Sequence, residues 1–150
     1  MTGKYYEDFQ VGEKHTSPGK TITDTHITLM VGLSGYNEPY FLDEEAAKKT
    51  MFGGRVAPGR MTVFLMGALA EQIGIFHDTA MAMVGLDKIK IKSPLRAGDT
   101  IRVVVEIVDK KDTSRPDRGI VIHKETCLNQ RDEVVAEVEV THLIKRRINL

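Results

Sequence analysis

The run from Met61 to Ala70 contains no charged side chain, and its apolar residues would surround a helix on every side. A helix of that kind is normally buried all round. The run is too short to cross a bilayer, which takes about 20 apolar residues. Pro58 suits the first turn, where the N–H that proline lacks would have no partner. The run therefore predicts a buried central helix over residues 60–76, with free backbone N–H groups at its N-terminus.

Alternating apolar and polar residues follow this helix and favour strands, most clearly at residues 89–92. Before the helix, Thr23 and Asp43 are suited to cap two short helices. The segment 36–41 between those helices is expected to be irregular, because Pro39 restricts the residue before it to extended geometry. The expected strands are residues 80–92, 101–107, 119–128 and 134–144, with a short strand or extended arm before residue 20 and a polar hairpin loop at 109–118.

This order of elements predicts an α+β fold, in which one antiparallel five-stranded sheet wraps around a long central helix. The 150 residues suit a single domain spanning residues 1–150. A single sheet covers only part of such a helix and leaves edge strands unpaired. Edge-to-edge pairing of two copies would cover both, so we expect a homodimer and leave a higher oligomer open.

Composition excludes several classes of function. Lys+Arg and Asp+Glu number 21 each, so the net charge is zero, which argues against nucleic acid as the main partner. Cys127 is the single cysteine, so an internal disulfide or a cysteine-based metal site is not expected. His15, His123 and His142 lack metal-ligand spacing, so we expect no metal. The polar residues 1–8 do not resemble a signal peptide, and we expect a cytoplasmic protein with no membrane contact.

Several segments, in their order and spacing, resemble the MaoC-like hot dog proteins, which include (R)-specific enoyl-CoA hydratases and 3-hydroxyacyl-thioester dehydratases. The resemblance implies a hot dog fold and a thioester of CoA or of a carrier protein as substrate or ligand, with no other cofactor. The matching segments are residues 6–13, Ser34-Gly35 with Pro39, residues 43–48, residues 52–59 and residues 86–99.

The family's catalytic stretch reads Ser-Gly-Asp-x-Asn-Pro-x-His, in which the Asp and the His activate a water that adds to the enoyl double bond. In this chain Tyr36 occupies the Asp position, Glu38 the Asn position and Phe41 the His position. Phenylalanine cannot transfer a proton, and a tyrosine with a pKa near about 10 is a poor base at neutral pH. Pro58 also replaces the usual His before the helix glycine. The usual catalytic pair is therefore absent.

The resemblance still implies a binding site. In the family, amides at the N-terminus of the long helix hold the thioester carbonyl oxygen. Gly59 stands at the matching position, beside Ala57 and Pro58. The acyl chain is expected to lie between subunits. Arg55 and Arg60 are each either a contact for the CoA phosphates or a solvated arginine. The expected substrate-binding residues are Gly59, Ala57, Pro58, Phe41, Met30, Met61 and Arg55.

Three residues of the loop are the candidates for catalysis. Glu38 is either a proton-transfer group or an exposed loop carboxylate. Tyr36 either donates a hydrogen bond to a carbonyl or packs beneath the loop. Asn37 is a candidate to hold a water. The sequence thus leaves three functions open: a hydratase or dehydratase with relocated catalytic groups, a noncatalytic acyl-thioester-binding protein, or an acyl-CoA thioesterase.

Overall fold

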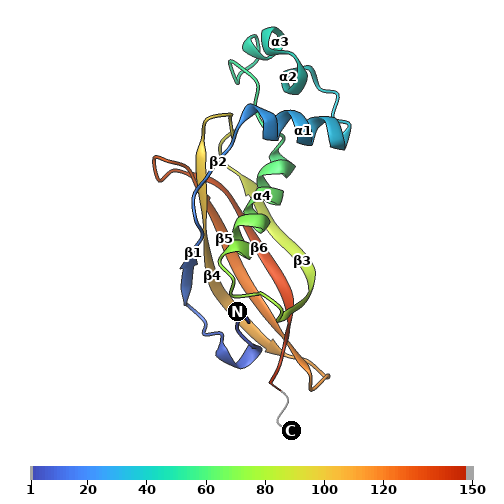
Figure 1. The fold of residues 1–150 in the computed structure, drawn as a ribbon, viewed down its shortest axis with the longest axis vertical. Coiled ribbons are helices and arrows are strands. Elements are labelled where there is room, and N and C mark those ends of the chain that lie inside the picture. The colour runs from blue at the N-terminus through green and yellow to red at the C-terminus, as the bar shows by residue number, and fades with distance from the viewer. Residues whose placement is uncertain (1, 148–150) are drawn as a thin grey trace.

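A computed structural model describes residues 2–147 of the chain. A six-stranded antiparallel sheet forms most of the fold, and helix α4, Gly59–Gln72, lies along one of its faces (Figure 1). The shorter helices α1, Asp24–Ser34, α2, Pro39–Leu42, and α3, Glu44–Lys48, gather near the N-terminal end of α4 (Figure 1). This is the predicted α+β arrangement of one antiparallel sheet around one long helix, with small helices before it.

The sheet has the strand order β1-β4-β5-β6-β3, and β2 also pairs with β4. The single strand or arm expected before residue 20 is instead a short 3-10 turn, Tyr6–Asp8, followed by two short strands. Pro18 lies between those two strands, where it cannot donate to the ladder. The strands are β1 (Lys14–Thr16), β2 (Lys20–Thr21), β3 (Ala80–Ile91), β4 (Thr100–Asp112), β5 (Arg118–Leu128) and β6 (Val134–Lys145).

The hairpin between β4 and β5 is longer than the sequence pattern predicts. Half of the residues expected as a polar loop, 109–118, are paired, and the ladder continues to Asp112 opposite Gly119. Backbone pairing does not need apolar side chains at the exposed end of a ribbon, so the polar composition was a misleading signal there. Only residues 113–117 form the connection.

The predicted caps of α1 and α3 are present. The Thr23 side chain accepts the N–H of His26, and α1 ends at Gly35, which adopts a left-handed φ of 74°. Asp43 Oδ1 accepts the N–H groups of Glu45 and Ala46 at the start of α3. These caps fix both short helices beside the N-terminus of α4.

The segment between α1 and α3 is more regular than expected. Glu38 is extended, with φ −66° and ψ 129°, as the following proline requires. Pro39 then begins a single helical turn, because a proline is tolerated at the first position of a helix. The expectation of a wholly irregular segment at 36–41 was wrong at this turn.

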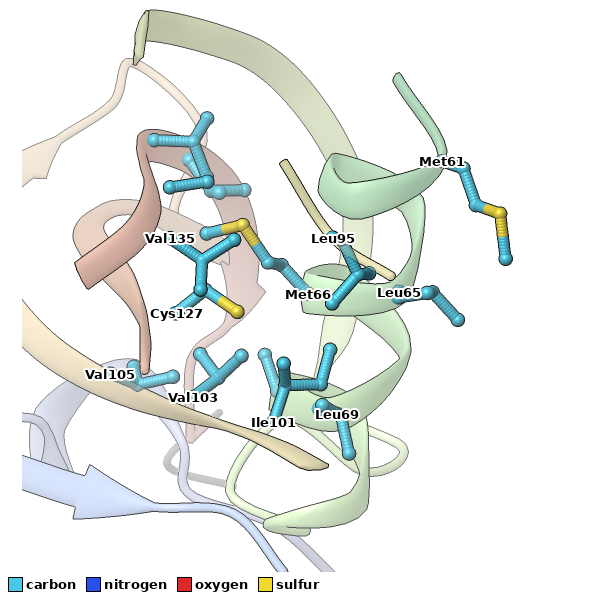
Figure 2. Close-up of a cluster of buried hydrophobic side chains, with 14 of the residues drawn as sticks. Met61, Leu65, Met66, Leu69, Leu95, Ile101, Val103, Val105, Cys127 and Val135 are labelled. Carbon is cyan, nitrogen blue, oxygen red and sulfur yellow. The ribbon is translucent and has the colours of Figure 1, made fainter. Parts of the chain in front are cut away.

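Helix α4 buries one side and leaves the other open. Met61, Leu65, Met66 and Leu69 are buried, whereas Phe64 is 65% exposed. Figure 2 shows Met66 extending from α4 toward Cys127 and Val135 of the sheet. The expectation of burial on every side is therefore wrong for the single chain, because one sheet covers only one side of a helix.

Helix α4 is also shorter than predicted. Gly74 adopts a left-handed φ of 86° shortly after Gln72, the last helical residue. A glycine in this conformation ends a helix, although the residues beyond it remain apolar. His77, which lies within one residue of the end predicted for this helix, is therefore outside it. With 14 residues in α4, none of the helices within residues 2–147 has the length and hydropathy needed to span a membrane.

Candidate functional site

A groove of about 980 Å³ runs along the open side of α4. The helix contributes Gly59, Val63, Phe64, Gly67 and neighbouring residues, which recur at helical spacing on one face. A Cβ added at Gly67 would meet no atom within 4 Å, so this glycine leaves open space in the groove. The other walls come from the loop before α3, from β3, and from β5 and β6. These walls are lined by Tyr36, Glu38, Tyr40, Phe41, Met83, Leu86, Ile89, Ile91, Glu125, Val138, Val140 and His142.

One end of the groove is the N-terminus of α4. Pro58 is the N-cap residue, and its carbonyl accepts the N–H groups of Met61 and Thr62. Within the described residues, no hydrogen bond involves the N–H groups of Gly59 and Arg60. Free amides at a helix N-terminus attract an anion or a carbonyl oxygen that gains negative charge. A Cβ on Gly59 would lie 3.4 Å from Ile91 Cγ1, so β3 runs close beside this end.

The loop residues predicted for catalysis lie at the mouth of the groove or outside it. Tyr36 is half-buried and packs edge-on against Phe41 at a ring distance of 5.4 Å. Glu38 lines the groove, but it is exposed and makes no side-chain hydrogen bond within the described residues. Asn37 is exposed and does not line the groove. The loop thus presents an aromatic wall and one solvated carboxylate.

Of the residues expected to bind substrate, the structure brings together Gly59, Pro58 and Phe41 in the groove. The remaining four have other contacts. Met30 and Met61 pack with the core, and the Ala57 N–H donates to Leu95 O at 2.8 Å. None of these three lines the groove.

Arg55 also does not line the groove. Its guanidinium pairs with Asp24 Oδ1 at 2.7 Å and with Glu44 Oε2 at 3.3 Å. These two contacts tie α1 to α3. Arg60, the other candidate for the CoA phosphates, is the arginine that lines the groove.

Three buried polar side chains lie beneath the groove, and sequence reasoning missed them. They are His123 and Glu125 of β5 and His142 of β6, which are 0%, 3% and 8% exposed. His123 Nε2 and Glu125 Oε1 are 3.1 Å apart. The available signal was the alternation of β5 and β6, which puts these residues on the same face as Val121 and Cys127.

Burial sets the protonation of two groups at this floor. It lowers the pKa of His142 to about 4, with a further contribution from nearby His123, so the imidazole of His142 is neutral at neutral pH. Burial also raises the pKa of the Cys127 thiol to about 12, and the carboxylate of Glu125 adds to this effect. Cys127 is therefore not a thiolate nucleophile.

The next question is whether side chains of the described residues could hold a metal ion. Within residues 2–147, no three His, Cys, Asp or Glu side chains are grouped so that they could hold a metal ion. The groove thus offers two kinds of chemistry: free amides at one end, and the Glu125 carboxyl group and the His142 imidazole along its floor, with His123 bonded to Glu125.

The low pKa of His142 makes stability depend on pH. An unfolded chain takes up a proton on this ring below about pH 6.5, whereas the folded chain does so only near pH 4. Stability is therefore lost as pH falls through that window. We expect the free energy of unfolding to fall by about 2 kcal/mol between about pH 7 and about pH 5 from this residue, measured by urea unfolding.

The His142→Phe variant should lose this part of the acid slope, because phenylalanine does not titrate. His77→Gln is the matched control, since the His77 side chain is 61% exposed and its replacement should leave the slope unchanged. An unaltered slope in His142→Phe would contradict the assignment.

Comparison with known proteins gives a consistent picture. The family model described as "MaoC like domain" matches residues 8–127. The chain is 29% identical to the (R)-specific enoyl-CoA hydratase of Rhodospirillum rubrum, over 95% of this chain and 93% of that protein.

Two solved structures share the fold. An Archaeoglobus fulgidus protein, described as a monoamine oxidase regulatory protein, superposes with a TM-score of 0.91 at 29% identity and covers 99% of this chain and 98% of that one. A Mycobacterium tuberculosis protein described as having a double hot dog fold superposes with a TM-score of 0.83 at 18% identity, over 99% of this chain and 46% of that one. Together with the family match over most of its length, the sheet, helix and groove make this chain a hot dog protein of the MaoC-like hydratase and dehydratase family.

Proposed function

We propose that the protein is a hydratase or dehydratase that acts on enoyl and 3-hydroxyacyl thioesters of CoA or a carrier protein. The observation that carries this proposal is the continuous groove from the free amides of Gly59 and Arg60 along the open side of α4. One end suits a thioester carbonyl, and the apolar remainder suits an acyl chain. The hydratase of Rhodospirillum rubrum, similar over nearly its whole length, supports this assignment.

The amides of Gly59 and Arg60 would stabilise the reaction intermediate. When water adds to C3 of an enoyl thioester, negative charge moves to the thioester oxygen. Two fixed N–H donors at a helix N-terminus bind this enolate oxygen more strongly than the neutral carbonyl. The exposed side chain of Arg60 lies beside them and is placed to meet a phosphate of CoA.

The assignment of proton transfer to Glu38, Tyr36 or a water held by Asn37 stays a prediction. Glu38 lies at the mouth of the groove in a single chain, where its carboxylate is solvated. A solvated carboxylate is a weak base toward a C–H proton. Tyr36 is packed against Phe41 and suits a role as part of the wall.

A second function has support from the same loop. The residues at the usual Asp and His positions, Tyr36 and Phe41, pack on each other. A protein that binds acyl thioesters without converting them would retain the groove and dispense with the catalytic pair. A thioesterase, the third possibility, gains no specific support from the groove.

We further propose that two copies pair through β3. This strand bonds to β6 on one side only, and both its faces are exposed along most of its length. A long apolar edge strand is normally covered in native proteins. The double hot dog fold of the Mycobacterium tuberculosis protein supplies a precedent for two such units side by side. The exposed apolar residues of β3 are Met81, Met83, Val84, Leu86, Ile89 and Ile91.

The acyl-chain assignment predicts a chain-length effect for Gly67→Leu. Gly67 lies eight residues from Gly59, about 12 Å along the helix. An extended chain advances roughly 1.2 Å per bond, so a four-carbon chain stops short of Gly67 and a ten-carbon chain reaches it. We expect the wild-type protein to hydrate both crotonyl-CoA and 2-decenoyl-CoA, followed by loss of the enoyl absorbance. Gly67→Leu should lower kcat/KM for 2-decenoyl-CoA about tenfold or more, with little effect on crotonyl-CoA.

Gly32→Leu is the matched control for this variant. Gly32 also lies in a helix, and a Cβ there meets no atom within 4 Å, but it does not line the groove. It should leave both rates unchanged. Saturable acyl-CoA binding without any turnover by the wild-type protein would instead favour the noncatalytic function.

The dimer proposal predicts a solution mass near twice that of one chain, measured by light scattering after size exclusion. The double variant Met81→Lys with Val84→Lys should shift the mass toward one chain, because a charge on an edge strand opposes pairing. A wild-type protein that stays monomeric at high concentration would refute the proposal.

A further inference from the structure

The buried residues His123 and Glu125 form a carboxylate–imidazole pair, of which Glu125 lines the groove. Both are almost fully buried, and their nearest side-chain atoms, His123 Nε2 and Glu125 Oε1, are 3.1 Å apart. Burial of such groups is costly unless they are paired, and the pair replaces two apolar residues that would pack without this cost. The same two chemical groups, a carboxylate and an imidazole, are those missing from the loop at Tyr36 and Phe41.

The surroundings hold the pair in one orientation. Phe76 stacks on the His123 ring at 4.8 Å and lies 5.1 Å from the His142 ring. With its proton on Nε2, His123 donates a hydrogen bond to Glu125 Oε1, which holds this carboxyl group in one orientation. A base oriented by a second group in this way is typical of catalytic pairs.

One oxygen of Glu125 remains available to a ligand. Glu125 Oε1 faces His123, whereas Oε2 makes no hydrogen bond within the described residues. An Oε2 without a partner that was fully enclosed would be one of the buried, unpaired atoms of the described residues, and it is not one of them. Oε2 is therefore reached by solvent, and Glu125 lines the groove. Oε2 therefore opens onto the groove.

Strand register relates Glu125 to the helix N-terminus. Ile91, which lies against Gly59, pairs with Ala136 of β6. Val138 follows two residues later and pairs with Glu125 of β5. Glu125 therefore lies about 7 Å along the strands from Ile91 and two strands, about 10 Å, across the sheet from it. Gly59 and Glu125 line the same groove, so a thioester whose carbonyl oxygen binds the Gly59 N–H lies in the groove that Glu125 also lines.

We propose that Glu125 is the proton-transfer group of this protein and that His123 is its positioning residue. This inference rests on the proposed hydratase function and names the groups that replace the missing loop pair.

The reaction balances with these groups alone. In hydration, Glu125 Oε2 removes a proton from a water as the water oxygen bonds to C3. The electron pair of the C2=C3 bond moves toward C1 and gives an enolate, whose oxygen is held by the amides of Gly59 and Arg60. The enolate then collapses, and C2 takes the proton from the Glu125 carboxyl. The product is the 3-hydroxyacyl thioester, and the carboxylate is regenerated; dehydration follows the reverse path.

The Glu125→Gln variant tests the proposal, because glutamine keeps the shape of glutamate and cannot take a proton. We expect kcat for crotonyl-CoA hydration to fall about 100-fold or more, as loss of a general acid–base group does. The dissociation constant of butyryl-CoA, measured by calorimetry, should change less than about threefold, because that ligand needs no proton transfer. Glu106→Gln is the matched control: Glu106 is on neighbouring β4 outside the groove, where it pairs with Lys14, and its variant should retain full activity.

A second variant keeps the test decisive if Glu125→Gln fails to fold. The double variant His123→Phe with Glu125→Met replaces both partners by apolar side chains of similar shape, which is often neutral or stabilising. It should fold, bind butyryl-CoA and fail to hydrate crotonyl-CoA.

Two results would overturn the proposal while leaving the hydratase function intact. One is turnover within about threefold of wild type in Glu125→Gln or in the double variant. The other is loss of turnover in Glu38→Gln with Glu125→Gln still active. A wild-type protein that binds butyryl-CoA but hydrates no enoyl-CoA would overturn the hydratase function and this inference together.

Discussion

The contact between α4 and the sheet is the constraint on which the rest of the structure depends. Met66 and Leu69 pack onto the sheet, and the opposite side of the same helix, whose run from Met61 to Ala70 is uncharged, has no cover within one chain. A helix that is apolar all round must either be enclosed or bind something. Here the uncovered side forms the wall of the groove. The apolar helix that stabilises the fold on one side therefore lines the proposed binding groove on the other.

The proposed function depends on two groups in the groove: the amides at the N-terminus of α4 and the Glu125 carboxyl group on the sheet. The helix N-terminus supplies amides without needing any particular side chain, so it tolerates the changes at Tyr36 and Phe41. The floor supplies Glu125 and His123 from a strand that must exist for the fold itself. A carboxylate held by the sheet is positioned more rigidly than one on a loop, and precise positioning is what proton transfer requires. Loss of the loop pair therefore need not mean loss of chemistry.

Much of the fold could be predicted from local signals. Thr23 and Asp43 identified two helix starts, and alternating residues identified β3 to β6, because caps and periodicity depend on neighbours in the sequence. The exposure of Phe64 could not be predicted, since it depends on how far one sheet extends around α4. The early end of α4 at Gln72 was set by one glycine conformation, at Gly74, that composition did not reveal.

The residues of the candidate site likewise divide into those that the sequence identified and those that it did not. Gly59 and Pro58 were found because they mark a helix N-terminus, and residues of the loop were found by their resemblance to a catalytic stretch. The pair of His123 and Glu125 was missed. Both occupy positions of β5 that face the core, but the histidines were considered only for metal binding and Glu125 was not considered. Arg55 was assigned to phosphate binding, but its ion pairs with Asp24 and Glu44 appear only once α1 and α3 are folded together.

The most direct measurement is a crystal structure with butyryl-CoA, a saturated and unreactive thioester. We expect its carbonyl oxygen within about 2.7–3.1 Å of the Gly59 backbone nitrogen and its C3 facing Glu125. An acyl chain bound outside the groove, or a carbonyl directed away from α4, would contradict it.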